Sequence, residues 1–519
     1  MNKNSNKETG ILLHISSLPS KYGIGTFGEE AFKFVDFLKA CNMNIWQILP
    51  LNITSYGDSP YQSPSSKALN YYFIDFDILI QKGLLKKEEV VNEKWFIKPL
   101  KVDYGIMFSK KIPLLKKAFS RFDITNRQFI DFVKNNNDLF ELAIFMSIKE
   151  FENYKPWNKW TEPLKNHDNE AIKEFAKKNM NLINFYLWTQ FEASNEYSEL
   201  KKYANNKGIK IMGDIPIYVS YDSVEVWSHP ELFELDEHKE MINMSGHPAD
   251  FYSKEGQLWG NPLYKWDAHK KSNYEWWISR VDYALKLYDL LRIDHFRGFS
   301  AYFSIPYGDK NALRGKRIKG PGNDLFDKLK NYPIVAEDLG LLDNEFYEFF
   351  NKTGYPGMRL INQAFDYEGR DGYWRPSNYT NNYFAYTSTH DSSTLLGLIK
   401  NKKNHKKEFE MLKRILNDEC HLLNVDNHFD SFNDIVYKCI ELCLASKAKT
   451  TIIAMQDLLL LDDKSRMNQP SSIGDFNWSW RMTKRLFNKN KKEIQKFLLK
   501  SIKMYIKFYW NSTKYILNL

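Results

Sequence analysis

The stretch Leu290-Leu291-Arg292-Ile293-Asp294-His295-Phe296-Arg297 begins as an apolar run and then presents a carboxylate at Asp294. Two further apolar runs end in the same way, at Glu337 and at Asp391. Because burying an unpaired charge is costly, a buried strand has no structural use for a carboxylate at its tip. Carboxylates at the ends of several strands therefore predict an active site at the mouth of a barrel.

The chain contains eight short runs rich in β-branched or aromatic residues, and helix-like amphipathic stretches separate most of them. The runs are Gly10–Ile15, Asn44–Leu49, Gly208–Asp214, Leu290–Asp294, Tyr332–Glu337, Met358–Gln363, Tyr383–Thr387 and Thr450–Gln456. Between the first two, the segment Glu29–Cys41 carries apolar residues at helical spacing: Ala31, Phe34, Val35 and Leu38. Near-continuous apolar strands that alternate with helices predict a parallel sheet, and eight such units predict an α/β fold of the (β/α)8 TIM-barrel type.

The predicted strands are unevenly spaced, which indicates insertions into a single catalytic barrel domain spanning residues 1–519. Between strands 2 and 3 lies far more chain than one helix needs, and much of it is charged and helix-like. We expect a mostly helical subdomain there, at residues 75–205. A second insertion, residues 220–286 between strands 3 and 4, is rich in Gly, Pro and aromatic residues. Such a composition is typical of a loop region, which we expect to cover the active-site cleft.

The composition excludes several classes of protein. The net charge of +9 comes from lysines scattered along helical stretches, which indicates solvated helix faces and no nucleic-acid partner. The four cysteines are too few for a disulfide framework and are expected to be buried thiols. Neither a phosphate-binding Walker pattern nor a zinc-ligand spacing occurs, so we expect no cofactor and no metal. Without a signal-peptide pattern or an apolar run of membrane-spanning length, the sequence predicts a cytoplasmic protein with no membrane partner.

The three carboxylates match the needs of glycosidic-bond cleavage with retention of configuration. That reaction uses a nucleophilic carboxylate and a separate carboxylic acid about 5–5.5 Å apart. Arg292 lies on the same face of its strand as Asp294, and a nearby guanidinium favours the ionised carboxylate that a nucleophile requires. Partial burial and the charge of Asp294 are expected to keep Glu337 protonated as the acid. Asp391, beside His390, is placed to hold sugar hydroxyls and stabilise an oxocarbenium-like transition state.

Each of these residues also has a structural interpretation. Asp294 could form only a buried ion pair with Arg292, and Glu337 and Asp391 could cap the helices that follow them. Trp259 could be a buried anchor of its loop, although its neighbour Leu258 could fill that role. The occurrence of three carboxylates at three strand ends favours catalysis over these alternatives.

Several multi-residue motifs occur in order from about residue 10 to about residue 482. They are Ser17-Leu18-Pro19, Tyr22-Gly23-Ile24-Gly25, Trp46-Gln47-Ile48-Leu49-Pro50-Leu51, Tyr56-Gly57-Asp58-Ser59-Pro60-Tyr61-Gln62-Ser63, Gly213-Asp214-Ile215-Pro216-Ile217-Tyr218-Val219, Gly256-Gln257-Leu258-Trp259-Gly260-Asn261-Pro262 and Arg466-Met467-Asn468. In these motifs the chain resembles the 4-alpha-glucanotransferases. This group, also called amylomaltases or disproportionating enzymes, is glycoside hydrolase family 77 of the alpha-amylase superfamily.

The resemblance implies a hexosyltransferase reaction of carbohydrate metabolism. A segment of an alpha-1,4-glucan would pass, with retention, to the 4-hydroxyl of an acceptor glucan or glucose through a covalent glycosyl-Asp294 intermediate. It implies that Glu337 is the general acid/base and that Asp391 stabilises the transition state. The substrate-binding residues that it implies are Tyr56, Tyr61, Asp214, Gln257, Trp259, Arg292, His295, His390, Asn468 and Pro470. Trp259 would lie on the acceptor side and Asn468 and Pro470 on the donor side. The expected partners are maltooligosaccharides and other alpha-1,4-glucans, and the expected state is a monomer or weak homo-oligomer.

The chain departs from the family pattern at positions that include no predicted catalytic residue: Leu69, Tyr71, Ala249, Gln363, Ser388, Ser392 and Ser393. These departures bear on sugar affinity and product length. Two other interpretations stay open. One is an alpha-1,4-glucan hydrolase of the same superfamily, and the other is a glucan-binding protein without activity, which the three intact carboxylates count against.

Overall fold

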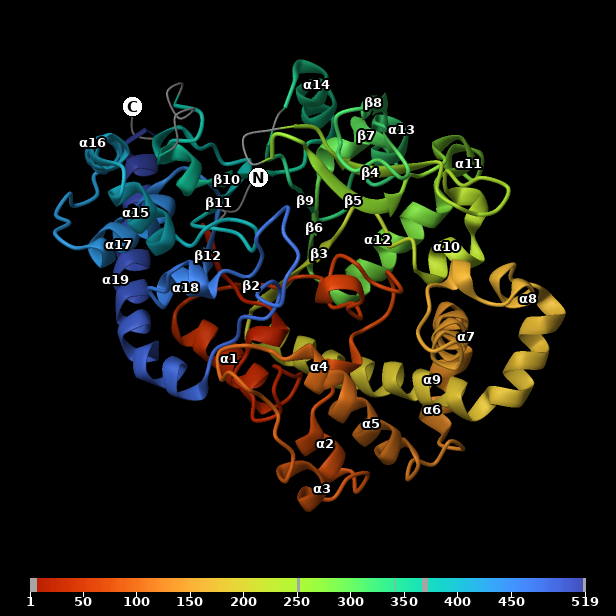
Figure 1. The fold of residues 1–519 in the computed structure, drawn as a ribbon. Coiled ribbons are helices and arrows are strands. Elements are labelled where there is room, and N and C mark those ends of the chain that lie inside the picture. The colour runs from red at the N-terminus through yellow and green to blue at the C-terminus, as the bar shows by residue number, and fades with distance from the viewer. Residues whose placement is uncertain (1–6, 250–252, 341, 366–371, 517–519) are drawn as a thin grey trace.

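A central sheet of eight parallel strands organises the molecule (Figure 1). The computed structural model describes residues 7–249, 253–340, 342–365 and 372–516, with side chains for all of these except residue 56 and residues 506–516. The strands are β1 (Glu8–Leu12), β2 (Ile45–Gln47), β3 (Lys210–Ile215), β6 (Leu290–Ile293), β9 (Ile334–Ala336), β10 (Gly357–Leu360), β11 (Tyr383–Tyr386) and β12 (Thr450–Ala454). All eight predicted strands are therefore confirmed.

The strands follow one another around the sheet in chain order, and β12 pairs with β1. The two remaining edges, β9 and β10, meet through the N–H of Ala336, which donates to the carbonyl of Pro356 at 2.9 Å. Beside it, the buried carboxylate of Asp338 accepts the N–H of Met358 at 2.6 Å and pairs with Arg359 at 2.9 Å. These contacts close the sheet, and the (β/α)8 barrel is confirmed.

Several strands are shorter than the sequence predicts, because their last polar residues leave the ladder. Asp294 lies one residue beyond β6, and Glu337 one residue beyond β9. Strand β10, which is the sixth strand of the barrel, ends at Leu360. Residues Ile361–Phe365, including Gln363, form a 3-10 helix. The polar residues that end these runs thus stand clear of the sheet at its carboxyl edge.

Helices occupy most of the chain between β2 and β3 and gather on one side of the barrel (Figure 1). They are α2 (Phe76–Gln81), α3 (Lys87–Val91), α4 (Tyr104–Ile106), α5 (Ile112–Phe119), α6 (Arg127–Lys134), α7 (Asn137–Phe151), α8 (Glu162–Lys165) and α9 (Asn169–Asn206). Trp157 and Trp188 are buried among them. The division of residues 75–205 into a separate subdomain stays a prediction.

A second, antiparallel sheet of four strands was not predicted. Its order is β5 (Gln257–Pro262), β4 (Asn243–His247), β7 (Ala301–Pro306) and β8 (Lys316–Lys319). Residues 220–286 thus contribute β4 and β5, and β4 pairs with β7 of a hairpin that follows β6. The sheet has a small core of its own, made by Met241, Met244, Phe303, Ile305 and Ala312. Strands β4, β5 and β8 carry many polar residues and so lack the apolar runs that marked the barrel strands.

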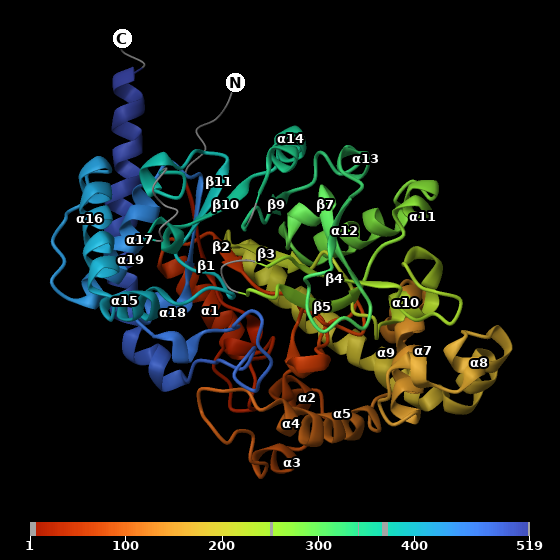
Figure 2. The same ribbon diagram turned by 45° about the horizontal axis from the view of Figure 1, so that its top comes forward.

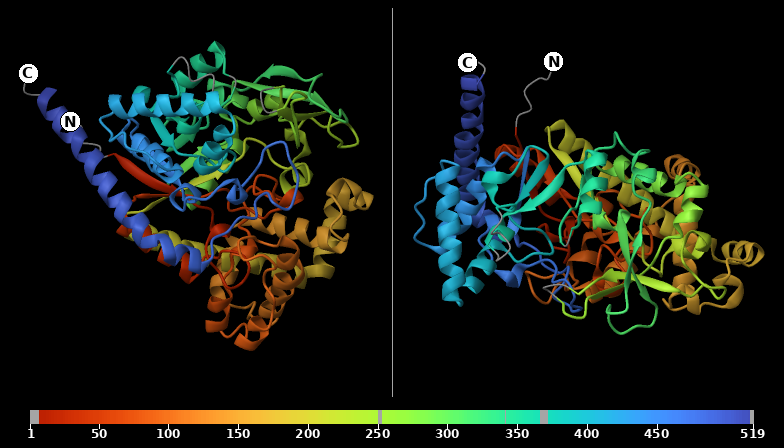
Figure 3. Two further views of the ribbon diagram at one scale, coloured as in Figure 1. Left: turned by 60° about the vertical axis from the view of Figure 1, so that its left-hand side comes forward. Right: turned by 90° about the horizontal axis from the view of Figure 1, so that it is seen from above.

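The remaining helices surround the barrel: α1 (Glu29–Ala40), α10 (Val224–Ser228), α11 (Trp266–Lys271), α12 (Glu275–Leu287), α13 (Asn323–Phe326), α14 (Asn344–Thr353), α15 (Leu395–Lys403), α16 (Lys406–Leu422), α17 (Phe432–Ala445), α18 (Met455–Leu458) and α19 (Lys484–Ile516). The predicted apolar face of α1 is buried. The far end of α19 projects beyond its neighbours (Figures 2 and 3). All four cysteines are buried free thiols, as predicted. Within the described residues, no helix combines the length and apolar character that a bilayer crossing requires.

Candidate active site

A cleft of about 520 Å³ opens at the carboxyl ends of the barrel strands. Asp294 after β6 and Asp391 after β11 both line it, which places two of the three predicted catalytic carboxylates in one space. The predicted substrate-binding residues that line it are Tyr61, Gln257, Trp259, His295, His390, Asn468 and Pro470. Arg292, Asp214 and Glu337 lie beneath them, almost fully buried. The side chain of Tyr56 lies outside the described part of the structure.

Arg292 joins two carboxylates at the floor of the cleft. Its Nη1 donates to Oδ2 of Asp214 at 2.6 Å, and its Nη2 donates to Oδ1 of Asp294 at 2.8 Å. The side chain of Asp214 is 0% exposed, whereas that of Asp294 is 26% exposed. Among the described residues, no group bonds the second oxygen of Asp294. Asp294 is therefore ion-paired but still presents one oxygen to the cleft, so the purely buried ion pair is excluded.

Glu337 is held by two backbone groups. Its Oε2 accepts the N–H of His295 and its Oε1 accepts the N–H of Leu339, each at 2.8 Å. Burial raises the pKa of Glu337 to about 8; Arg292 and the two N–H groups oppose this rise, while the charge of Asp294 adds to it. At neutral pH the group is thus a protonated acid beside an ion pair.

The backbone of His295 adopts a left-handed conformation that few residues other than glycine take, with φ of 49°. This conformation accompanies the hydrogen bond from its N–H to Glu337. Backbone strain of this kind is typical of functional sites, where surrounding contacts impose it. Burial lowers the pKa of the His295 ring to about 3, and the ring is therefore neutral.

Asp391 lies across the cleft and is held as an anion. Burial favours its neutral form, but His390, with Nε2 at 3.1 Å from Oδ2, and Asn468, whose Nδ2 donates to Oδ1 at 2.6 Å, lower the pKa of Asp391 to about 2. The guanidinium of Arg466 donates to the backbone carbonyl of Asp391. The carboxylate is fixed in place, yet 41% of its side chain is exposed.

Aromatic rings line the same part of the cleft. Tyr61 stacks on His390, with ring centroids 5.2 Å apart and planes at 16°, and its hydroxyl donates to Asp214 at 2.8 Å. Trp478, which the sequence analysis missed, lies 5.5 Å from the ring of Tyr61. Its φ of 59° is unusual for a bulky residue. The three aromatic residues at alternate positions 476, 478 and 480, shortly after the Asn468 motif, were the signal that could have indicated it.

Trp259 borders the cleft from β5. Its Nε1 donates to Oε1 of Gln257 at 3.1 Å, and its ring meets the ring of His295 edge-on at 4.8 Å. Leu258 is 39% exposed and so does not anchor this strand, contrary to the alternative raised for it. Trp259 is only half-buried, and its remaining surface faces the cleft.

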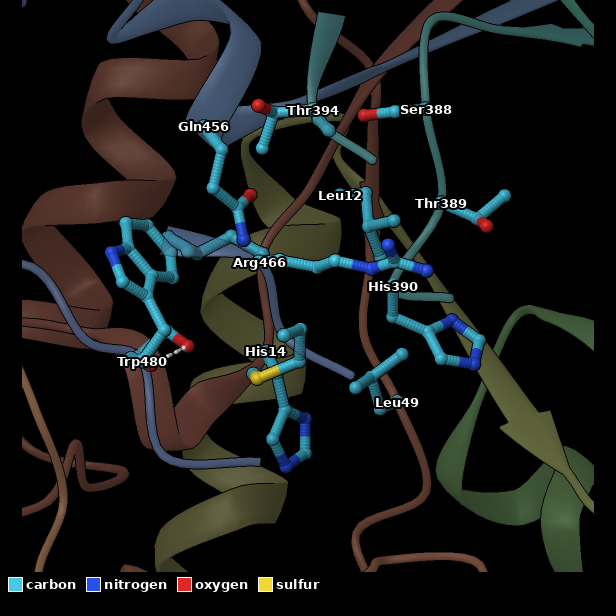
Figure 4. A pocket seen from close by; sticks show the side chains of 14 residues that line it. Leu12, His14, Leu49, Ser388, Thr389, His390, Thr394, Gln456, Arg466 and Trp480 are labelled. Atoms are coloured by element: carbon cyan, nitrogen blue, oxygen red, sulfur yellow. Dashed lines mark hydrogen bonds between the residues drawn. The ribbon is translucent and has the colours of Figure 1, made fainter. Parts of the chain in front are cut away.

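A separate small cavity lies behind His390 (Figure 4). Its volume is about 20 Å³, and its lining includes His14, Gln456 and Arg466. Arg466 extends across it toward His390 in Figure 4. This space fits about one water molecule, and it is too small for a sugar ring.

The prediction that Glu337 and Asp391 could cap the helices that follow them is wrong. Helix α14 is capped by Asp343, which accepts the N–H of Phe346 at 2.9 Å, and α15 is capped by Thr394. Glu337 and Asp391 therefore cap neither helix. Among the described residues, no group of three or more His, Cys, Asp and Glu side chains has an arrangement that could hold a metal ion.

Most departures from the family pattern occupy supporting positions. Leu69 and Tyr71 are buried in the core. Hydrogen bonds join Ser388 to Asp457, Ser392 to Thr389 and Ser393 to Arg466. Gln363 and Ala249 do not line the cleft.

Comparison with known proteins agrees with this geometry. Residues 13–487 match the model of a family described as 4-alpha-glucanotransferase. The chain belongs to the 4-alpha-glucanotransferase family. Among its curated relatives, the 4-alpha-glucanotransferase of Clostridium butyricum is 43% identical, with 92% of this chain and 96% of the relative covered. That of Aquifex aeolicus is 42% identical, with 94% and 98% covered.

Solved structures lead to the same family. An amylomaltase from Streptococcus agalactiae, solved in complex with acarbose, superposes with a TM-score of 0.89. It is 39% identical, and the match covers 96% of this chain and 99% of that one. Membership of this family makes the chain an enzyme of the 4-alpha-glucanotransferase class, as the sequence predicts.

Proposed function

We propose that this enzyme transfers segments of alpha-1,4-glucans between maltooligosaccharides by two displacements at Asp294. The observation that carries the proposal is one cleft that holds an ion-paired carboxylate and a second carboxylate kept as an anion, with a neutral carboxylic acid buried beneath them. That combination meets the needs of retaining glycosyl transfer. The protonation states differ because burial and the charge of Asp294 raise the pKa of Glu337, whereas His390 and Asn468 lower the pKa of Asp391.

In the first displacement, Asp294 attacks the anomeric carbon of the sugar with Oδ2, the carboxylate oxygen that accepts no hydrogen bond from Arg292. The C1–O bond breaks, and its electron pair goes to the leaving glucan oxygen, which takes the proton of Glu337. Positive charge develops on the sugar ring as the bond lengthens. The anionic side chain of Asp391 is placed to stabilise this charge and to hold ring hydroxyls. The product of this step is a glycosyl-Asp294 ester.

In the second displacement, Glu337 has lost its proton and acts as the base. It removes the proton from the 4-hydroxyl of an acceptor glucan, whose oxygen attacks C1 and releases Asp294 as a carboxylate. Two inversions retain the alpha configuration and give ping-pong kinetics. Tyr61 and His390 offer ring faces beneath the bound sugar, while Asp214 and Arg292 fix the floor of the site.

Whether a sugar or water reaches the intermediate separates a transferase from the alternative hydrolase. Trp259 and the second sheet border the cleft beside Glu337, where an acceptor displaces water. The relatives named above are 4-alpha-glucanotransferases, which supports transfer over hydrolysis as the main reaction.

Incubation with maltotriose alone tests the proposed function. We expect glucose together with a ladder of glucans longer than maltotriose, because a glucose leaving group frees a maltosyl intermediate for transfer. The products are separated by chromatography, and the chain length of each product is determined by mass spectrometry. A product mixture that contains only glucose and maltose would identify a hydrolase instead.

The raised pKa of Glu337 predicts a specific pH dependence. With maltotriose, kcat/KM is expected to fall as pH rises through about 8, because the acid loses its proton in the free enzyme. With alpha-maltosyl fluoride, the fluoride ion leaves without a proton, so the kcat/KM for fluoride release is expected to lack this fall. An identical alkaline fall with both donors would show that another group titrates.

A further inference from the structure

The cleft has two sides, one beside the acid Glu337 and the other beside the carboxylate of Asp391. Glu337 is bonded to the N–H of His295, and the ring of His295 contacts Trp259 on β5. On the opposite side, Asp391 is bonded to Asn468, where the cleft-lining segment 468–474 begins. An acid that protonates the leaving oxygen lies between the cleaved sugar and the leaving glucan. The leaving glucan, and the acceptor that replaces it, therefore lie on the β5 side.

The tip of the β7–β8 hairpin forms part of this side. Lys310 and Asn311, in the connection between β7 and β8, line the cleft together with Glu255 and Gln257. They belong to none of the motifs that carry the family resemblance and lie in the segment that follows β6.

The hairpin tip is held firmly against the segment before β5. The N–H of Ala312 donates to the carbonyl of Glu255 at 2.8 Å, and Ala312 is buried in the small core of the second sheet. Gly256 has a φ of +70°, and a Cβ added there would lie 2.6 Å from the Cβ of Ala312, so only glycine permits this close approach. Arg314 pairs with Asp309 across the tip, and its Nε donates to Oδ2 at 2.9 Å. The two cleft residues therefore stand on a fixed support.

Both residues carry donors suited to sugar hydroxyls. Asn311 uses its Oδ1 to accept the N–H of Leu313 at 3.2 Å, which orients the side chain and leaves its amide NH₂ to donate. Lys310 is exposed and has no acidic partner within ion-pair distance among the described residues. Neutral hydroxyls accept hydrogen bonds from both groups without the loss of an existing ion pair.

We propose that Lys310 and Asn311 bind hydroxyl groups of the acceptor glucan and thereby set acceptor affinity. This inference rests on the proposed function, and it deepens it by naming residues of the β7–β8 hairpin that bind the acceptor. These residues make no contact with the reacting carboxylates, so they are specificity-determining residues and not catalytic ones. Acceptor binding by these two residues promotes the second displacement when a sugar is the acceptor. Attack of water on the intermediate does not depend on this binding.

The test separates the two displacements with alpha-maltosyl fluoride as the donor and maltose as the acceptor. Fluoride release without acceptor reports formation and hydrolysis of the intermediate, whereas the rise in transfer product with maltose concentration reports acceptor binding. In Lys310→Ala/Asn311→Ala we expect the acceptor KM to rise about 5- to 30-fold, as the loss of two hydrogen bonds predicts. Fluoride release without acceptor is expected to match that of the parent.

Two further variants make the outcome decisive. Lys316→Ala removes an exposed lysine from β8 of the same hairpin, away from the cleft lining, and should leave the acceptor KM unchanged. Lys310→Met keeps the aliphatic stem, so it should raise the acceptor KM without disturbing the tip. An unchanged acceptor KM in the double variant, or an equal loss of fluoride release, would overturn the assignment. A parent enzyme that neither releases fluoride nor transfers would instead overturn the proposed function.

Discussion

Replacing Asp294 with asparagine is expected to lower turnover about 10⁴-fold or more, as the loss of a nucleophile does in enzymes that form covalent intermediates. An amide oxygen is too weak a nucleophile to form the glycosyl ester. The amide still offers an oxygen to Nη2 of Arg292, and Arg292 keeps its second partner, Asp214. Oligosaccharide binding is therefore expected to persist, and calorimetry with maltooligosaccharides measures it.

Asp282→Asn is the matched control for this variant. Asp282 lies on α12, away from the cleft lining, where it accepts a hydrogen bond from the hydroxyl of Tyr332. We expect parental turnover from it. If Asp294→Asn kept turnover comparable to that of this control, the assignment of Asp294 as the nucleophile would be wrong.

Replacing Glu337 with glutamine is expected to lower turnover on maltotriose about 10²- to 10⁴-fold, which is the usual contribution of a general acid. Formation of the intermediate from alpha-maltosyl fluoride is expected to be much less affected, because this leaving group needs no proton. The enzyme then stalls at the second displacement, where the base is also missing. A burst of fluoride followed by slow release measures this behaviour.

Azide provides a second test of Glu337→Gln, because rescue by azide would not occur if the variant were only structurally defective. This anion attacks C1 without the removal of a proton, so it is expected to restore release of the intermediate and to form an alpha-maltosyl azide. Glu345→Gln, at an exposed position of α14, serves as the control and should behave as the parent. Equal losses with maltotriose and the fluoride, with no azide product, would contradict an acid/base role for Glu337.

The barrel could be predicted because each of its strands is buried on both faces. Such strands are near-continuous apolar runs, and they contrast clearly with the helices between them. Their order and approximate position follow from the sequence. The exact ends do not follow, because Asp294 leaves the ladder for an ion pair with Arg292 that only the folded barrel provides, and Gln363 lies in a 3-10 helix.

The second sheet could not be predicted in the same way. Strand β8 is exposed along its whole length, and only the last two residues of β5 are buried. The four strands of this sheet lie on both sides of β6 in the sequence, so no local pattern reveals how they pair. Lys310 and Asn311 were missed for this reason, since only the pairing of β7 with β4 brings their hairpin to the cleft.

The predicted site residues have a similar explanation. Asp294, Asp391 and Trp259, which line the cleft, could be predicted as candidates because motifs and strand ends carry them. Trp478 was missed because it follows no strand, and its place beside Tyr61 depends on a long return of the chain after β12. The protonation of Glu337 could be anticipated from its expected burial, whereas the two backbone donors that hold it could not.

The central claim is that Asp294 becomes covalently linked to the glucan during transfer. Glu337→Gln treated with alpha-maltosyl fluoride should accumulate that ester, because its release is the slowed step. Digestion followed by mass spectrometry then locates the added maltosyl group. We expect one maltosyl group on the peptide that contains Asp294, and none on that peptide in Asp294→Asn/Glu337→Gln. A maltosyl group on any other carboxylate would contradict it.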